Sequence, residues 1–370
     1  IAIVAGAAAI SAAIPHQNPA TARVPLQSAT TATADFPPRS GRDIVFTPVP
    51  PDVEPDVLTE PIVITRGSAP RGELAVDGNY VVWRSYEDKQ TNVVAYDLRT
   101  GEERRLSSSP GGKSSSRVSG RYVVWSDTLD DPGVYRVSVR AYDLVSGQEM
   151  LVSTTGGYPD VSGAMIVWST SRNPQDRMET DIYGYDLERD AEFPIVVGPG
   201  RHMFPRISGD WVIYLNWTAD IGPITPAPDQ PTIHAHSIRT GEDINLGLVA
   251  YRNDAWSYRL HVISGHMVAW QGKDGATHVY DLAARRERLL TEPKFYYDLV
   301  LEGRYFAIGV RLFSIETGEA LDPFRTQEVV PFGPAPHIDG DATDGRTLAW
   351  VFSNDGEKGR IYVARYIRWP

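Results

Sequence analysis

The chain has 370 residues, of which 42% are hydrophobic and 22% are charged, an ordinary balance for a globular protein. Its formal net charge of −11 argues against a nucleic-acid-binding protein, because such a protein presents a basic surface. It contains no cysteine, which excludes disulfides, thiolate metal ligands and cysteine nucleophiles.

Residues 1–22 form an apolar N-terminal segment. Residues 1–14 carry no charge, yet they are too few to span a bilayer, which needs about 20 residues. The segment is either the remnant of a signal peptide, with Ala20-Thr21-Ala22 as its cleavage site, or a retained membrane anchor or assembly segment. We expect it to be retained and buried in lipid or protein. Each interpretation places the rest of the chain outside the cytoplasm, in the periplasm or at the cell surface.

Residues 23–60 are interrupted repeatedly by proline, with serine, threonine and alanine between. Proline removes backbone donors and favours an extended chain. The sequence therefore predicts a proline-rich linker over 23–60, followed by one folded region over 61–370.

A repeat with a period near 40 residues dominates the folded region. Its units share a turn glycine, which is Gly78, Gly120, Gly163, Gly209, Gly265, Gly303 or Gly345. Five residues after this glycine the units carry Trp83, Trp125, Trp168, Tyr214, Trp270, Ile308 or Trp350. The short apolar run between the two positions is typical of a strand buried on both faces. The repeated tryptophans are therefore predicted to fill the core.

A second apolar run follows in each unit and ends in a tight turn, often of Thr-Gly or Ser-Gly type. Several of these runs end in Tyr-Asp-Leu, whose aspartates are expected to accept hydrogen bonds within the turn: Asp97, Asp143, Asp186 and Asp281. With a shorter polar strand after the turn, each unit has four antiparallel strands. Such units arranged radially predict an all-β, seven-bladed β-propeller. The last unit lacks an outer strand, so residues 61–66 are predicted to complete it and close the ring.

This repeat resembles that of the TolB-like propellers. The resemblance is carried by Ser-Gly-Arg-Tyr-Val-Val-Trp at 119–125, Phe-Pro-Arg-Ile-Ser-Gly-Asp at 204–210 and Ala-Tyr-Asp-Leu-Val-Ser-Gly at 141–147. It covers roughly residues 73–366. It implies the fold and leaves the activity open, because one propeller fold hosts many functions.

The longest connections are expected on one face and in one sector of the propeller, at 127–136, 170–180, 216–231 and 247–257. Loops on a rigid scaffold are where binding residues concentrate, and tryptophan and arginine tend to dominate interface energy. The residues predicted to contact a partner are Trp217, Trp256, Arg172, Arg177, Asp130, Asp131 and Arg252. The two tryptophans are the expected anchors, because they fall outside the repeat register.

Three histidines are the candidates for a metal site, because the innermost strands of a propeller line its central channel. They are His202, His261 and His337, and converging imidazoles are common metal ligands. Their offsets from the turn glycines differ, so they are not expected at one level of the channel. We therefore predict no metal or other cofactor.

No catalytic signature occurs, since the G-x-S-x-G, H-E-x-x-H, P-loop and G-x-G-x-x-G patterns are absent. The sequence predicts a non-catalytic, extracytoplasmic interaction or structural module. It is expected to hold a protein partner or copies of itself and to reach the membrane through its N-terminal segment, with no nucleic-acid partner. The alternative is a metal-dependent polysaccharide lyase or hydrolase that uses the channel histidines.

Overall fold

The structure, a computed structural model, describes the chain from residue 44 to residue 365 with gaps. The described residues are 44–45, 47–48, 62–64, 69–70, 73–87, 90–131, 134–173, 176–217, 231–250, 261–291, 299–302, 305–308, 311–315, 319–321, 338–344, 346–352 and 360–365. They all belong to the larger of two compact units, residues 36–370. Their regular structure is entirely β-strand, with no helix among them.

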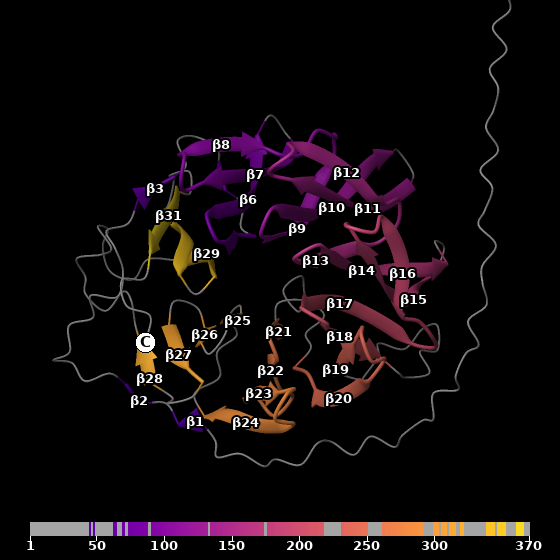
Figure 1. Cartoon of the computed structure of the whole chain (residues 1–370), viewed down its shortest axis with the longest axis vertical. Coiled ribbons are helices and arrows are strands. Elements are labelled where there is room, and N and C mark those ends of the chain that lie inside the picture. The colour runs from indigo at the N-terminus through magenta and orange to yellow at the C-terminus, as the bar shows by residue number, and fades with distance from the viewer. Residues whose placement is uncertain are drawn as a thin grey trace, which may run out of the picture. The chain divides into compact units, whose positions relative to one another are not determined.

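Successive stretches of the chain form antiparallel sheets that follow one another around a common centre (Figure 1). The first sheet contains β4 (Ala69–Pro70), β5 (Ala75–Asp77), β6 (Tyr80–Glu87), β7 (Gln90–Asp97) and β8 (Glu102–Arg105). The second contains β9 (Gly112–Ser119), β10 (Tyr122–Asp131), β11 (Val134–Asp143) and β12 (Gln148–Ser153).

An eight-stranded sheet comes next and consists of two antiparallel halves. The first half contains β13 (Gly157–Ser162), β14 (Met165–Asn173), β15 (Asp176–Asp186) and β16 (Ala191–Val196). The second half contains β17 (Arg201–Ser208), β18 (Trp211–Trp217), β19 (Thr232–Ser237) and β20 (Asp243–Leu248). The halves are joined by a single parallel pair, Thr180 with Arg201.

The remaining sheets combine the C-terminal part of the chain with short strands from before residue 64. One contains β21 (His261–Ser264), β22 (Met267–Gln271), β23 (Thr277–Asp281), β24 (Arg286–Thr291) and β1 (Ile44–Val45). The next contains β25 (Leu299–Glu302), β26 (Tyr305–Ile308), β27 (Arg311–Ser314), β28 (Glu319–Leu321) and β2 (Thr47–Pro48). The last contains β29 (Ile338–Thr343), β30 (Thr347–Phe352), β31 (Arg360–Arg365) and β3 (Ile62–Val63).

The short N-terminal strands pair in two ways. β3 runs antiparallel to β31, with Ile62 opposite Val363, as expected for residues 61–66 and 361–366. β1 and β2, by contrast, run parallel to β24 and β28. They lie within the range 23–60 to which the sequence analysis assigns a linker. The fold class is all-β with four-stranded antiparallel sheets, as predicted.

The turn glycines connect each sheet to its predecessor. Gly120, Gly163, Gly209 and Gly265 have φ between +55° and +57°, a backbone conformation that glycine adopts without steric cost. Each donates its N–H to the side chain that precedes the turn one sheet earlier: Gly120 to Asp77 (2.5 Å), Gly163 to Ser119 (3.0 Å), Gly209 to Ser162 (3.1 Å) and Gly265 to Ser208 (2.8 Å). Gly78 donates in the same way to Asp344, 266 residues away (2.8 Å).

The hydrophobic core is divided into clusters that lie between consecutive sheets. One cluster joins Val82 and Val93 to Trp125, and another joins Val124 and Val139 to Trp168. Trp83, Trp125, Trp168 and Trp270 are at most 1% exposed, which confirms their predicted core role. The side chain of Trp350 lies outside the described residues. These four indoles therefore fill space between neighbouring sheets.

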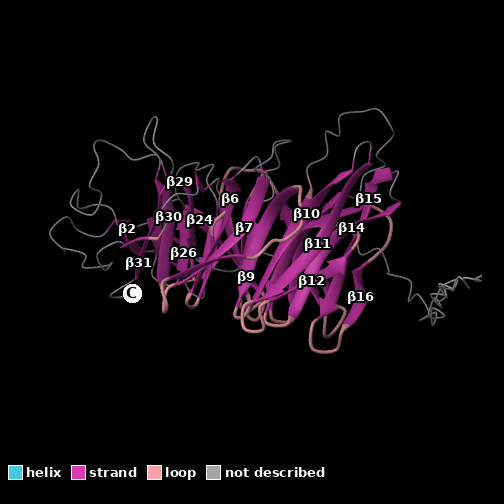
Figure 2. Ribbon diagram, turned by 90° about the horizontal axis from the view of Figure 1, so that it is seen from above, coloured by secondary structure: helices cyan, strands magenta, loops and turns pink. Residues whose placement is uncertain are grey.

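The aspartates of the Tyr-Asp-Leu motif cap the tight turns, as predicted. Their Oδ1 atoms accept backbone N–H groups two residues on, at Arg99 (2.8 Å), Val145 (2.9 Å), Glu188 (2.9 Å) and Ala283 (2.9 Å). Figure 2 shows these short turns gathered along one side of the sheets, which we name the turn face. The opposite side carries the ends of the β10–β11 and β14–β15 hairpins, and we name it the hairpin face.

Replacement of a core indole should be costly. We expect Trp125→Ala to lower the free energy of unfolding by about 3–5 kcal/mol, because it leaves a large cavity between two sheets. Trp211→Ala is the matched control, since Trp211 is only partly buried and lies beneath Arg285. Urea unfolding measures both, and equal losses would contradict the core assignment.

The turn aspartates should make the free energy of unfolding depend on pH in the acidic range. Hydrogen bonds from Arg121, whose Nε lies 2.7 Å from Oδ1, lower the pKa of Asp143 to about 2. Because this folded-state pKa lies below the unfolded value near 4, the stabilisation is present above pH 4 and is lost as the pH falls towards 2. Unfolding measured across this range should be less pH-dependent in Asp143→Asn and in Arg121→Gln. Unchanged pH dependence in both variants would refute the assignment.

Candidate functional site

Two long hairpins, β10 with β11 and β14 with β15, end on the hairpin face. Pairing continues to Asp131 with Val134 in the first hairpin and to Asn173 with Asp176 in the second. These strands have 9 to 11 residues, whereas β22 and β23 have 5 each. Two of the segments that the sequence analysis expects as long connections, 127–136 and 170–180, are therefore mostly strand, because hairpin pairing continues to Asp131 and Asn173.

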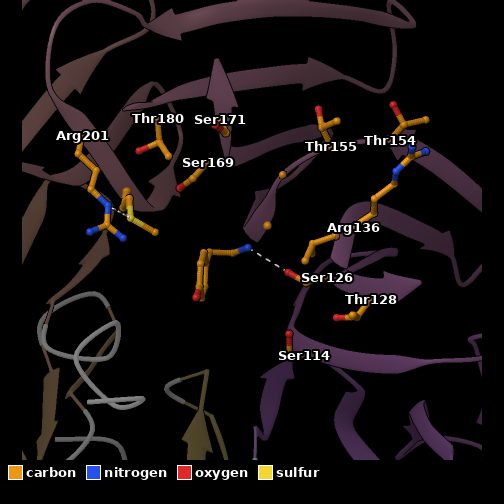
Figure 3. A pocket seen from close by; sticks show the side chains of 15 residues that line it. Ser114, Ser126, Thr128, Arg136, Thr154, Thr155, Ser169, Ser171, Thr180 and Arg201 are labelled. Carbon is orange, nitrogen blue, oxygen red and sulfur yellow. Dashed lines mark hydrogen bonds between the residues drawn. The ribbon is translucent and has the colours of Figure 1, made fainter. Parts of the chain in front are cut away.

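A cavity of about 540 Å³ opens among these strands (Figure 3). Its walls come from β9, β10 and β11, from β13, β14, β15 and β17, and from the link between β12 and β13. The lining residues are Ser114, Ser126, Thr128, Arg136, Val137, Thr154, Thr155, Gly156, Gly157, Tyr158, Ser169, Ser171, Thr180, Arg201 and Met203. The cavity therefore lies among three consecutive four-stranded groups.

The inner part of the cavity rests on a repeated backbone feature. Ser115, Tyr158 and Phe204 each stand five residues before a turn glycine and have φ between +56° and +57°. Residues other than glycine pay about 1–2 kcal/mol for this conformation, so it persists only where the surroundings hold it. The N–H of Tyr158 donates to Ser126 Oγ (3.0 Å), and that of Phe204 donates to Ser169 Oγ (3.1 Å). Serines of one sheet thus hold the strained inner strand of the next.

Two glycines bring the link between β12 and β13 close to its neighbours. A Cβ atom at Gly156 would lie 2.5 Å from Cδ1 of Trp168 and 2.6 Å from the backbone oxygen of Ser169. The φ of Gly156 is +108°, which side chains also disfavour. A Cβ at Gly157 would lie 3.3 Å from Val137 and 3.4 Å from Ser126, inside the cavity. The glycine pair therefore keeps the cavity open.

A buried charge network fixes the wall formed by β9 and β10. The Lys113 ammonium lies 3.0 Å from Asp127 Oδ1, and both side chains are fully buried. Arg140 Nε lies 2.6 Å from Asp127 Oδ2. Lys113 also donates to the backbone oxygens of Ser109 (2.9 Å) and Gly111 (3.0 Å). Each buried charge is paired, as burial requires, and the network orders the strand start beside Ser114.

The described lining is polar. It offers serine, threonine and tyrosine hydroxyls and two guanidinium groups. Among the described lining residues there is no aspartate, glutamate, histidine, cysteine or lysine. The cavity can therefore donate and accept hydrogen bonds and attract negative charge.

The histidine candidates occupy separate environments. His202 on β17 is 5% exposed, with Nδ1 3.8 Å from Asp181 Oδ1. His261 on β21 is fully buried, and its Nε2 donates to the backbone oxygen of Phe204 (2.7 Å). Burial and the positive charge of Arg206 lower the pKa of His261 to about 3, so its imidazole is neutral at physiological pH. His337 lies outside the described residues, among which no group of three metal-ligating side chains occurs.

The predicted partner-binding residues divide into three groups. Trp217 is 6% exposed, packs edge-on against Phe204 with ring centroids 6.4 Å apart, and belongs to a core cluster. Its burial does not support the anchor role that the sequence analysis gives it, because little of the indole is left for a partner. Arg172, Arg177, Asp130 and Asp131 lie in β14, β15 and β10, with side chains outside the description. Arg252 and Trp256 lie outside the described residues.

Sequence reasoning missed most of the lining. Its hydroxyl residues are common on any surface, and they come from five strands and one link that are separate in sequence. A usable signal was the run Thr154-Thr155-Gly156-Gly157 between two strands, where paired glycines indicate close backbone approach. Arg201 gave no signal, since its role depends on a neighbouring sheet.

No family model matches the chain, and no curated protein matches it. Among the described residues no helix is long and apolar enough to cross a membrane. Similarity is found instead among solved structures, and the four described below are each under 25% identical to this chain, so they concern the fold.

Three of these structures have TM-scores above 0.5. A prolyl endopeptidase matches at 15% identity and TM-score 0.57, over 81% of this chain and 47% of its own. The β-propeller domain of the Trilobed protease from Pyrococcus furiosus matches at 10% identity and TM-score 0.53, over 80% of this chain and 93% of that domain. Oligogalacturonate lyase in complex with manganese matches at 12% identity and TM-score 0.51, over 83% and 93%. TolB from Acinetobacter baumannii matches at 16% identity and TM-score 0.43, over 61% of this chain and 55% of its own.

The chain therefore has a β-propeller fold, like the propeller domain of the Trilobed protease. It spans about half the length of the TolB and prolyl endopeptidase chains that it matches. Its function has to be argued from its own site.

Proposed function

We propose that the chain is a seven-bladed β-propeller that acts as a non-catalytic protein-interaction module, with its hairpin face as the contact surface. The observation that carries this proposal is the open cavity on that face, whose lining is rich in hydroxyls and contains no acid–base group. A rigid scaffold with binding residues on one face is the usual design of such a module.

Seven blades and a closed ring follow from treating each glycine-to-glycine unit as one blade. The antiparallel pairing of β3 with β31 supports closure, since the N-terminal strand completes the last unit. The hydrogen bond from Gly78 to Asp344 and the core cluster that contains Trp83, Val351 and Ile361 support it further. With closure, β3 pairs with the strand of the last unit that would otherwise have an unpaired edge.

The proposal places the propeller outside the cytoplasm, tethered or assembled through residues 1–22. The uncharged apolar run over 1–14 and the proline-rich stretch over 23–60 support this placement. The metal-dependent alternative gains no specific support, because His202 and His261 are engaged separately, one beside Asp181 and one with a backbone oxygen.

Ring closure can be tested at the N-terminal strand. Ile64 is 3% exposed and its N–H donates to the backbone oxygen of Ile361 (3.0 Å), whereas Ile62 is 51% exposed. We expect Ile64→Ala to lower the free energy of unfolding by about 2–5 kcal/mol. Ile62→Ala is the matched control and should change it little. Equal melting temperatures for the two variants would argue against closure by this strand.

The contact face can be mapped by site-specific cross-linking, because the natural protein has no cysteine. A photoreactive maleimide is attached to Thr155→Cys on the hairpin face or to Val145→Cys, an exposed position on the turn face. In the cells that produce the protein, we expect cross-links to a protein from position 155 and not from position 145. Cross-links from position 145 alone would overturn the proposed face.

A further inference from the structure

We propose that the cavity on the hairpin face binds a carboxylate-bearing, extended peptide segment, with Arg136 and Arg201 as its two charge contacts. This inference rests on the proposed function, since it names the chemistry of the partner that the hairpin face would hold.

The local charge of the cavity opposes that of the whole protein. Among the described residues that line it there are two arginines and no acidic residue, although the protein has a net charge of −11. Among the described residues neither arginine forms an ion pair, whereas Arg121, Arg140 and Arg189 each pair with a carboxylate. Two cationic groups beside a cavity with no acidic residue in its described walls favour an anionic ligand.

Arg201 is held in a defined orientation. Its Nε donates to the sulfur of Met203 (2.9 Å), and its guanidinium carbon lies 5.3 Å from the centre of the Trp217 ring. The guanidinium is planar, so its remaining N–H groups lie in one plane and match the geometry of a carboxylate. The buried Trp217 therefore acts as the platform for Arg201 and not as the anchor itself.

The two arginines are placed for an extended ligand. Figure 3 shows Arg201, from β17, and Arg136, from β11, on opposite sides of the cavity. A single small anion could not use both, whereas a peptide that crosses the cavity could place one carboxylate near each. Arg136 is exposed, so its long side chain can adapt to the spacing.

The hydroxyls between the arginines fall into two sets. Ser126, Ser169 and Thr180 are committed to backbone groups of the protein. The side chains of Ser114, Thr128 and Thr154, in contrast, make no hydrogen bond to another described residue. Hydroxyls of the second set can form hydrogen bonds with the amides and carbonyls of a bound peptide backbone. Each of these backbone groups needs a hydrogen-bond partner when binding removes its water.

A peptide fits this lining better than a sugar. Tyr158, the single aromatic lining residue, meets the Phe204 ring in a T-shaped contact with centroids 4.6 Å apart. The Trp217 ring nearby is covered by Arg201. The lining therefore presents no open aromatic platform for a sugar ring, while Val137 and Met203 offer apolar walls for side chains.

The test measures binding of fluorescent pentapeptides to the full-length protein by anisotropy. The probes are Gly-Asp-Gly-Asp-Gly with a free or an amidated C-terminus, Gly-Lys-Gly-Lys-Gly, and an acidic trisaccharide labelled in the same way. We expect both acidic peptides to bind, the lysine peptide not to bind, and the affinity to fall as salt rises. A loss on amidation alone would assign the contact to the terminal carboxylate of the peptide, and no loss would assign it to acidic side chains. Either result supports the proposal.

The variants localise the binding. Arg201→Gln and Arg136→Gln should each weaken acidic-peptide binding by about tenfold or more, because each variant removes one charge-assisted hydrogen bond to the peptide. Gly157→Val should abolish binding by filling the cavity. Arg189→Gln, at an exposed turn-face arginine, is the matched control and should leave binding unchanged. Melting curves check the fold of each variant, and Arg136→Gln, at an exposed position, cannot fail through a lost core contact.

Three results would overturn the proposal: no binding of the acidic peptides, binding that Arg136→Gln and Arg201→Gln leave intact, or binding of the acidic trisaccharide in place of the peptides. These failures are distinct from failure of the proposed function. Cross-links from Thr155→Cys without peptide binding would keep the contact face and reject the ligand. Peptide binding with cross-links only from Val145→Cys would keep the cavity site and reject the hairpin face as the partner surface.

Discussion

The fold depends on one repeated hydrogen bond, in which a turn glycine donates to the side chain before the turn of the preceding sheet. The glycine is needed because its φ is positive, and its N–H is then directed at the neighbouring sheet. The acceptor must be short, which explains serine at Ser119, Ser162 and Ser208. Each sheet is thus aligned by its predecessor, and the buried indoles fill the space that this alignment leaves.

A second set of contacts between sheets lies nearer the hairpin face and has a different consequence. There Ser126 and Ser169 hold the strained residues Tyr158 and Phe204, which places an irregular backbone beside the cavity. The strain is maintained by hydrogen bonds across the sheet boundary, so the cavity shape is a property of several sheets together. This explains how a scaffold of repeated units acquires one distinct site: the repeat builds the sheets, and the departures from it at the boundaries build the binding surface.

The sequence predicts more of the fold than of the candidate site. The strands, the buried tryptophans and the capping aspartates followed from spacing, because each is a local signal that recurs in several units. Trp217 shows the limit of that reasoning. It stands outside the repeat register, which suggested a surface role, yet it packs on Phe204 and supports Arg201. The packing that the units share does not explain a residue outside the repeat register. The register alone does not predict whether the side chain of such a residue is buried or exposed.

The sequence by itself determined the class of fold, since glycine and aromatic residues at fixed spacing specify turns and doubly buried strands wherever they recur. It also determined an acidic, cysteine-free protein without catalytic signatures. Only the tertiary structure decided which hydroxyls and which arginines meet in one cavity, and that Gly157 leaves it open. The physical reason is that strand signals act between residues close in sequence. The cavity is made by side chains from β9 to β17, brought together by the angle and spacing of neighbouring sheets.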